Sequence, residues 1–260
     1  MFRLAALSTS ALALSMTAAV AATGVGLTDD RTLVMFDTET LEVTGTMEVE
    51  GVDRLLGIDM RAADNSLIGV TDDMRIVTID TASGAATELS VMDTPLPVAD
   101  QPVIVDVNPA ADRLRLMTGV TNHRVNMDTG EVTADGDLNW AAEDENSEAM
   151  PMSVATGYTN SFGTPESTAM YNIDAGIGAL IRQTAPNDGT LATVGMLEVA
   201  EPGAEMAFDI QGDADGNNMA WLVTGNAIYS VDLDSGMATQ AGQIEGVEGQ
   251  IRDLTVLPAM

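Results

Sequence analysis

Short apolar segments alternate with polar turn residues along the chain from residue 23 onward, and the pattern is clearest in residues 54–92. The apolar segments in this stretch cover residues 55–60, 67–71, 75–80 and 86–90. The turns between them are rich in Asp, Asn, Ser and Gly. Short apolar segments bounded by such residues are typical of β-strands joined by tight turns. We therefore expect four antiparallel strands here, and an all-β protein as a whole.

One phrase recurs within this pattern. An Asp or Asn follows an apolar residue and precedes a Gly by four positions at Asp80, Asn126 and Asp232, and weaker copies begin at Asp37 and Asp174. Asp and Asn side chains accept hydrogen bonds from backbone amides in a turn, and Gly adopts the positive φ that the turn needs. We expect each copy to form the hairpin between the third and fourth strands of a repeat.

The copies are separated by 43 to 58 residues. A repeat of about 40–50 residues that contains four short strands is typical of a β-propeller blade. Further first strands are expected at residues 103–107, 153–158, 206–210 and 251–257. No second strand follows the last of these, whereas residues 24–28 resemble a second strand that lacks a first. We predict a five-bladed β-propeller of four-stranded blades in which the C-terminal strand closes the first blade and removes its open edge.

The first residues of the chain have a different character. Residues 1–22 carry a positive charge near their start, at Arg3, and then consist mainly of small and apolar residues without any acid. A small-x-small pattern at Ala19 and Ala21 lies near the end of the segment. This arrangement is typical of a secretory signal peptide. We expect a signal peptide over residues 1–22 and a single propeller domain over residues 23–260. The protein should then be periplasmic or secreted and should not insert into a membrane after cleavage.

The charge balance excludes some partners. The chain has 40 acidic residues against 10 basic ones, all of them Arg, and a formal net charge of −30. Nucleic acids and anionic membranes bind protein surfaces that are rich in Lys and Arg, so we expect neither as a partner. The acids are spread along the chain, which favours a general effect on solubility over a surface that collects cations. The chain has no cysteine, so disulfides and thiol chemistry are excluded. We expect a monomer.

Several strings resemble the DUF4394 family. They are LLGIDMR at 55–61, DRLRL at 112–116 with RVNMDTG at 124–130, YTNS at 158–161, and NDGTL at 187–191. The resemblance covers nearly the whole chain after the signal peptide, and it implies an exported, propeller-like bacterial protein. The chain departs from the family pattern in its acidic segment Glu143–Glu148 and in its lack of Lys. The family has no established activity, so the resemblance implies no catalytic residue.

A basic cluster is the first candidate site. Its members are Arg113, Arg115, His123, Arg124 and Asn126. Arg113 and Arg115 are two positions apart on an expected strand and share one face, as do Arg124 and Asn126 on the next strand. Converging guanidinium groups could hold a small anion such as a carboxylate, phosphate or sulfate through paired hydrogen bonds. Alternatively, these arginines only neutralise acids of the protein itself, such as Asp106 or Asp112.

A set of carboxylates is the second candidate site. Asp59, Asp106, Asp209 and Asp253 occupy equivalent places in the first strands of four blades, and Tyr158 takes that place in the other. First strands line the channel of a propeller, where such carboxylates could bind Ca²⁺ or raise one another's pKa. Alternatively, each Asp accepts hydrogen bonds from backbone amides of the next blade.

The remaining motifs indicate no catalytic machinery. Residues 213–218 resemble the start of a calcium loop, but the expected Gly and final acid are missing, so we interpret them as a turn. The chain has one His and no nucleophile motif. We interpret the protein as a non-enzymatic binding module for a small anionic ligand or a protein, with the Glu143–Glu148 segment and the basic cluster as contact regions. Two alternatives remain: a carboxylate- or metal-assisted hydrolase acting at the channel mouth, and a structural envelope protein.

Overall fold

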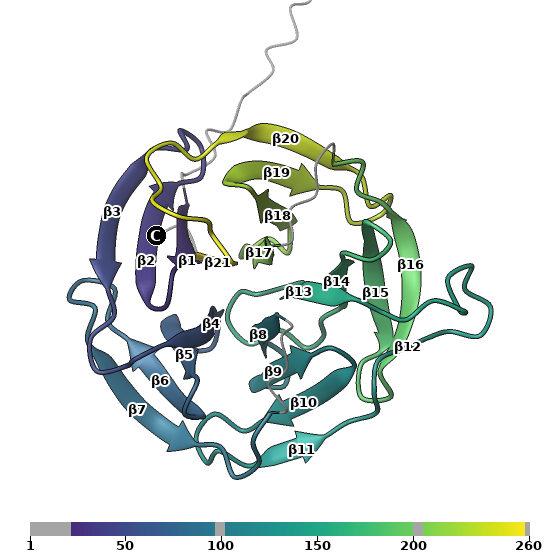
Figure 1. Cartoon of the computed structure of the whole chain (residues 1–260), viewed down its shortest axis with the longest axis horizontal. Helices are drawn as coiled ribbons and strands as arrows, with labels where there is room; N and C mark the ends of the chain where they lie inside the picture. The colour runs from purple at the N-terminus through teal and green to yellow at the C-terminus, as the bar shows by residue number, and fades with distance from the viewer. Residues whose placement is uncertain (1–21, 97–101, 200–204, 258–260) are drawn as a thin grey trace, which may run out of the picture.

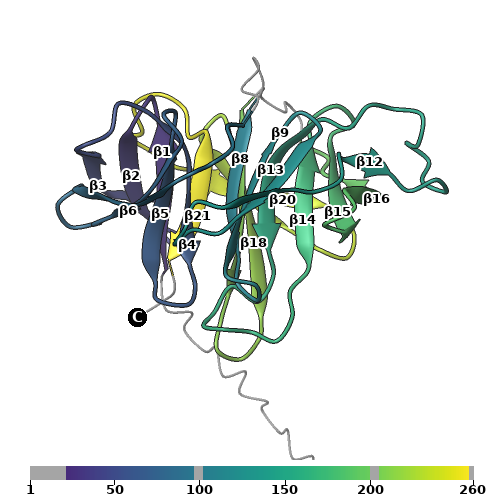
Figure 2. The same ribbon diagram turned by 90° about the horizontal axis from the view of Figure 1, so that it is seen from below.

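The computed structural model describes residues 22–96, 102–199 and 205–257. Five antiparallel sheets stand side by side around a central axis, and the predicted five-bladed propeller is confirmed (Figure 1). The side view shows most strands running roughly upright, along the direction of that axis (Figure 2). The signal peptide is predicted over residues 1–22, of which residues 1–21 lie outside the described residues. The described part of the chain contains no helix that is long and apolar enough to cross a membrane.

Each blade is counted from the channel outward. Blade 1 contains β21 (Asp253–Leu257), β1 (Thr23–Thr28), β2 (Thr32–Asp37) and β3 (Val43–Glu48). Blade 2 contains β4 (Leu55–Arg61), β5 (Ser66–Thr71), β6 (Arg75–Ile79) and β7 (Ala86–Val91). Blade 3 contains β8 (Val103–Asn108), β9 (Arg113–Thr118), β10 (Thr121–Val125) and β11 (Val132–Ala134).

Blade 4 departs slightly from the predicted four strands. It contains β13 (Ser153–Tyr158), β14 (Met170–Asp174), β15 (Ala179–Ala185) and β16 (Thr190–Met196), and the short β12 (Asn139–Trp140) joins its outer edge in parallel with β16. Blade 5 contains β17 (Met206–Gly212), β18 (Asn218–Thr224), β19 (Ala227–Val231) and β20 (Ala238–Gln243).

The closure of blade 1 also agrees with the sequence. Strand β21 pairs antiparallel with β1, and the register brings Leu257 opposite Thr23 and Asp253 opposite Leu27. Arg252 strengthens this closure because its guanidinium donates to the carbonyl oxygens of Leu55 at 2.6 Å and Leu56 at 3.1 Å in the neighbouring blade. The ring is therefore closed by strand pairing and by a cation that bonds backbone oxygens.

The recurring phrase forms hairpins, as expected. Asp80 Oδ1 accepts hydrogen bonds from the amides of Ala82 at 3.0 Å and Ser83 at 2.8 Å, and Asp232 bonds its own turn in the same way. The glycines that end three copies have φ of 76°, 75° and 80°: Gly84, Gly130 and Gly236. The side chain therefore ties the turn while the glycine supplies its left-handed residue.

One copy stands in a different place from the one we predicted. Asp174 ends β14, the second strand of blade 4, so its phrase joins the second and third strands rather than the third and fourth. The third and fourth strands of that blade are joined through Gly189 instead, whose φ is 71°. The prediction was wrong for this blade because the phrase is a local turn code that serves any antiparallel hairpin.

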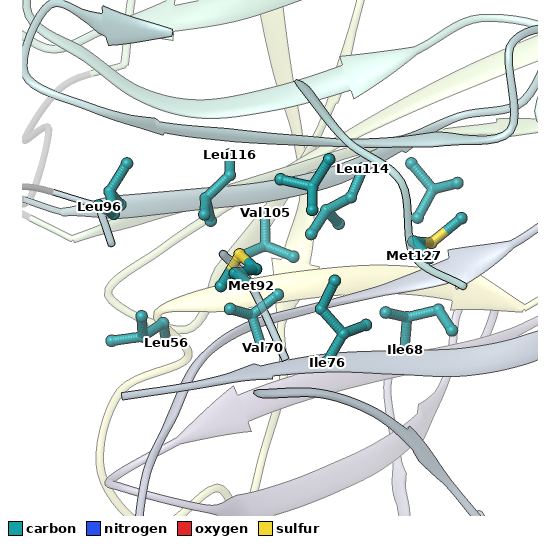
Figure 3. Close-up of a cluster of buried hydrophobic side chains, with 12 residues drawn as sticks. Leu56, Ile68, Val70, Ile76, Met92, Leu96, Val105, Leu114, Leu116 and Met127 are labelled. Atoms are coloured by element: carbon teal, nitrogen blue, oxygen red, sulfur yellow. The ribbon is translucent and has the colours of Figure 1, made fainter. Parts of the chain in front are cut away.

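The core lies between the blades rather than within one of them. The largest cluster fills the interface of blades 2 and 3, where Figure 3 shows Val70 and Ile76 on one side and Leu114 and Leu116 on the other. Burying one such aliphatic side chain stabilises the fold by roughly 1.5–3 kcal/mol. Close packing also restricts residue type on the central strands, since a Cβ at Gly57 would lie 2.6 Å from the Asp253 carboxylate.

Candidate functional site

The four first-strand aspartates face the channel, where three of them link neighbouring blades. Asp253 accepts a hydrogen bond from the Ile58 amide of blade 2 at 2.7 Å. Asp59 accepts one from the Val107 amide of blade 3 at 2.6 Å. Asp209 accepts one from the Val256 amide of blade 1 at 2.6 Å. Each contact is a hydrogen bond from a backbone amide of the next blade, which is the alternative to a Ca²⁺ site that we considered for these aspartates.

Asp106 breaks this pattern. It is 4% exposed, and no hydrogen-bond donor contacts its carboxylate among the residues that the structure describes. Blade 4, which follows it around the ring, carries Tyr158 instead of an aspartate at the corresponding place. Asp59, Asp106 and Asp209 each place one carboxylate oxygen within 4.8 Å of the other two, and Asp253 lies outside this group.

Electrostatics at this cluster disfavour three negative charges. Burial, followed by the charges of Asp59, Asp209 and Asp253, raises the pKa of Asp106 well above its usual range. Burial and the charge of Asp209 do the same to the pKa of Asp59. Burial also raises the pKa of Asp209 despite its two hydrogen bonds from backbone amides. Such a cluster can hold protons or a cation.

The basic cluster lies in blade 3 on the side facing blade 4. Arg115 on β9 is directly opposite Arg124 on β10, and Arg113 lies two residues from Arg115, so the three side chains leave the sheet on one face. They line a cavity of about 420 Å³. Tyr158 and the turn at Pro186 and Asn187 form its wall from blade 4.

Arg115 forms the centre of this interface. It is 2% exposed and donates to Asp135 Oδ2 at 2.8 Å and to Asn122 Oδ1 at 2.7 Å. Its Nε donates to the Tyr158 hydroxyl at 3.2 Å in blade 4. Burial raises the pKa of that hydroxyl, while the Arg115 charge opposes this effect. Arg115 thus links blade 3 to blade 4, an interface to which the Asp106 carboxylate contributes no hydrogen bond among the described residues.

Asp135 neutralises two of the three arginines. Arg124 donates to its two oxygens at 2.6 and 2.9 Å. Burial opposes ionisation of Asp135, but the hydrogen bonds from Arg124 and Arg115 outweigh it and lower its pKa. The carboxylate partner of Arg115 and Arg124 is therefore Asp135 rather than Asp106. Asp112 accepts from Arg61 of blade 2 at 2.8 Å, and this hydrogen bond and the charges of Arg61 and Arg113 all lower its pKa.

Arg113 is the arginine of the pocket that is not paired with Asp135. Its Nη1 donates to the backbone oxygen of Asp112 at 2.9 Å, and within the described ranges it forms no ion pair. The side chain of Arg124 is 35% exposed and can also be reached from solvent. The pocket can therefore offer guanidinium groups to a ligand without breaking the bonds to Asp135.

Two residues of the predicted cluster lie elsewhere. His123 precedes Arg124 on β10 and so points to the opposite face, where it is buried and burial lowers its pKa. Asn126 closes its own turn by accepting from the Asp128 amide at 3.1 Å. Sequence reasoning missed Asp135 and Asn187. Asp135 follows β11 of the same blade, and the pairing of β10 with β11 places it beside the arginines, where its amide donates to the Asn122 carbonyl oxygen at 2.9 Å. Asn187 reaches Arg115 through the packing of blade 4 on blade 3.

The two acidic segments behave differently. The segment with Glu143–Glu148 extends beyond the rim of the ring between β12 and β13 (Figure 1), and Asp144 anchors it by accepting from the Thr193 amide at 2.7 Å. In residues 213–218, Asp213 Oδ1 accepts from the amides of Asp215 and Asn217 at 2.9 Å each, and the segment joins β17 to β18. The interpretation of these residues as a turn is confirmed.

Comparisons with known proteins agree with the fold. A family model described as "Domain of unknown function (DUF4394)" matches residues 32–255. The comparison with curated protein sequences finds no match. A solved structure of a protein of unknown function from Bacteroides thetaiotaomicron is similar with a TM-score of 0.54 and 13% identity, over 92% of this chain and 66% of that one.

Two further solved structures are similar at low identity. A luciferin-regenerating enzyme has a TM-score of 0.50 and 11% identity, over 90% of this chain and 79% of that one. An auxiliary nutrient binding protein from Bacteroides thetaiotaomicron has a TM-score of 0.49 and 13% identity, over 88% of this chain and 58% of that one. At such identities the similarity shows the fold alone, and an activity has to be argued from the site.

Proposed function

The chain belongs to the DUF4394 family, which is described as a domain of unknown function, and we propose that it is an exported, non-enzymatic binding module that holds a small anionic ligand between blades 3 and 4. The observation that carries the proposal is the cavity of about 420 Å³ lined by Arg113, Arg115 and Arg124. Asp135 is the carboxylate that pairs with two of them, and Arg113 forms no ion pair among the described residues.

The chemistry of the pocket favours a carboxylate or phosphate group. Guanidinium groups bind such oxyanions through two parallel N–H···O bonds. Asn187 and Tyr158, which also line the cavity, add polar groups that can orient a ligand. The rest of the molecule limits the size of the ligand, because a chain with a net charge of −30 repels large anions such as acidic proteins. A small metabolite-sized anion fits both constraints.

Export is supported by the predicted signal peptide over residues 1–22. The hydrolase alternative is less well supported. Asp59, Asp106 and Asp209 surround a space of only about 10 Å³, which cannot admit a substrate such as a sugar. A structural envelope protein would need no available arginine in an open pocket, so the ligand experiment below also bears on that alternative.

Calorimetric titration of the chain over residues 23–260 with citrate, inorganic phosphate and sulfate tests the proposal. We expect binding of at least one of these oxyanions, and at least tenfold weaker binding after Arg113→Ala. Arg54→Ala is the matched control, since it removes the same charge from a side chain that is 54% exposed and distant in sequence from the pocket. Binding that is equal in both variants, or absent with all three anions, would reject the proposal.

A further inference from the structure

A second cluster of charged side chains lies in the central channel, and the proposed anion pocket does not use it. It consists of Asp59, Asp106 and Asp209, which come from blades 2, 3 and 5 and are 6%, 4% and 6% exposed. One oxygen of each carboxylate lies within 4.8 Å of the corresponding oxygens of the other two. The ring thus brings three buried acids from distant parts of the chain to one point.

Two members of the cluster have structural roles that explain their burial. Asp59 accepts from the Val107 amide and from the Thr255 hydroxyl, the latter at 2.9 Å. Asp209 accepts from the amides of Val256 and Ile210, each at 2.6 Å. Each of these oxygens keeps a second lone pair that can still bind a ligand.

Asp106 has no such role. Its carboxylate lines the small channel cavity and contacts no hydrogen-bond donor within the described ranges. A buried carboxylate without a partner is costly, because a charged or polar group removed from water loses its solvation. The equivalent aspartates of the other blades all bond a backbone amide. The carboxylate of Asp106 instead faces the channel cavity with no hydrogen bond from the described residues, so it can take a ligand there.

The cavity beside Asp106 has the size and lining of a cation site. Its volume of about 10 Å³ for the centre of a water-sized sphere leaves room for roughly one atom or ion. Tyr158, Ser161 and Thr255 complete its polar lining, which includes no basic residue among those that the structure describes. A single small ion is therefore the occupant that both fits the volume and offsets the charge.

We propose that Asp59, Asp106 and Asp209 together bind one divalent cation, and that Ca²⁺ is the ion that matches them best. Oxygen ligands select hard cations, and the absence of Cys and His from the cluster disfavours the transition metals. Ca²⁺ takes ligands at about 2.3–2.6 Å, so it can bridge oxygens up to roughly 5 Å apart, whereas Mg²⁺ demands a tighter octahedron. Bound there, the ion ties three blades together.

Calorimetric titration of CaCl₂ into the chain over residues 23–260, previously treated with EDTA, tests this proposal. We expect one Ca²⁺ per chain, tighter binding than for MgCl₂, and a higher midpoint of thermal unfolding in Ca²⁺ than in EDTA, because a ligand of the native state stabilises it by mass action. Asp106→Asn should weaken Ca²⁺ binding at least tenfold. The same variant in EDTA should unfold at or above the wild-type midpoint, since the Asp106 side chain makes no hydrogen bond with the described residues.

Asp215→Asn provides the matched control, since it removes one carboxylate from the turn at residues 213–218 that resembles a calcium loop. It should leave Ca²⁺ binding unchanged. Loss of binding in this variant, or unchanged binding in Asp106→Asn, would overturn the proposal by placing the ion elsewhere. The absence of any heat or stabilisation at millimolar Ca²⁺ would overturn it as well and would indicate that the three carboxyl groups share protons. None of these outcomes depends on the anion pocket.

Discussion

The Nε of Arg115 donates to the Tyr158 hydroxyl at 3.2 Å, and this bond joins blade 3 to blade 4 between two cavities of opposite charge. Tyr158 lines the arginine pocket on one side and the aspartate cavity on the other. The other blades that carry a first-strand aspartate use its carboxylate to bond a backbone amide of the next blade. Between blades 3 and 4, the bond from the Arg115 guanidinium to the Tyr158 hydroxyl takes that role. The Asp106 carboxylate can therefore bind a ligand in the channel.

Removing the Tyr158 hydroxyl should weaken this interface. In Tyr158→Phe the buried Arg115 loses an acceptor, and hydrogen bonds to charged groups contribute about 1.5–3 kcal/mol, so we expect the free energy of unfolding to fall by about that amount. Urea denaturation measures it. Tyr229→Phe is the control, since Tyr229 is half-buried on β19 and the structure gives its hydroxyl no hydrogen bond within the described residues. Equal losses in the two variants would contradict the role of the bond.

Asp135 should be more important for stability than any exposed acid. Its side chain is 5% exposed, and Asp135→Asn leaves Arg115, at 2%, without its carboxylate. Breaking a buried ion pair in this way costs about 3–5 kcal/mol. Asp234→Asn, in an exposed turn, should cost less than about 0.5 kcal/mol in the same urea denaturation experiment.

The pH dependence of the Asp135 contribution follows from the direction of its pKa shift. The native pKa lies below the ordinary value of 3.8, so the unfolded chain binds a proton more readily than the native chain does. The contribution of Asp135 is therefore fully present above that value and is lost as pH falls through the native pKa. Wild type and Asp135→Asn should approach each other in stability in acid, and a constant difference down to about pH 2 would contradict this expectation.

Asp253 should give the opposite pH dependence. Burial raises its pKa from 3.8 to about 7, so between these values the native chain retains a proton that the unfolded chain loses. Its contribution is present below about pH 4 and decreases by up to about 1.4 kcal/mol per pH unit as pH rises towards 7. Urea denaturation in EDTA should therefore show Asp253→Asn gaining stability relative to wild type over this range. A difference independent of pH would contradict the raised pKa.

Two glycines of the recurring phrase should respond very differently to substitution. Gly130 and Gly178 have similar φ of 75° and 65°. A Cβ at Gly130 would lie 1.9 Å from the Val91 carbonyl oxygen of blade 2, whereas a Cβ at Gly178 meets nothing within 4 Å. Gly178→Ala should cost only the backbone strain of about 1–2 kcal/mol. Gly130→Ala should cost clearly more, or prevent folding, as measured by thermal unfolding of the two variants.

The sequence predicted the fold because its signals are local. Asp80 and Gly84 specify a turn through contacts within five residues, and the spacing of such turns reveals the repeat. The exception at Asp174 shows the limit of this reasoning, since the same local code does not state which pair of strands it joins. Closure by β21 was also predictable, because an unmatched strand at each end suggests that the two pair.

The candidate sites could be predicted only in part. Strand alternation correctly placed Arg113, Arg115 and Arg124 on one face, and the alignment of first strands brought the aspartates to the channel. The choice of Asp135 as the partner of Arg115 could not be predicted from spacing, because the chain offers 40 acids. The sequence also could not show that Asp106 differs from the other aspartates. That difference arises because no described backbone amide of blade 4 donates a hydrogen bond to its carboxylate.

The pairing of β1 with β21 has a consequence for how the molecule reaches its native state. Residues 23–28 must wait for residues 253–257, so the ring can close only after the chain between them has been synthesised and ordered. Until then the inner edge of blade 1 presents unpaired backbone groups, and the corresponding strand of another molecule can occupy it. Folding at high protein concentration should therefore yield strand-exchanged dimers whose formation competes with closure of the single ring.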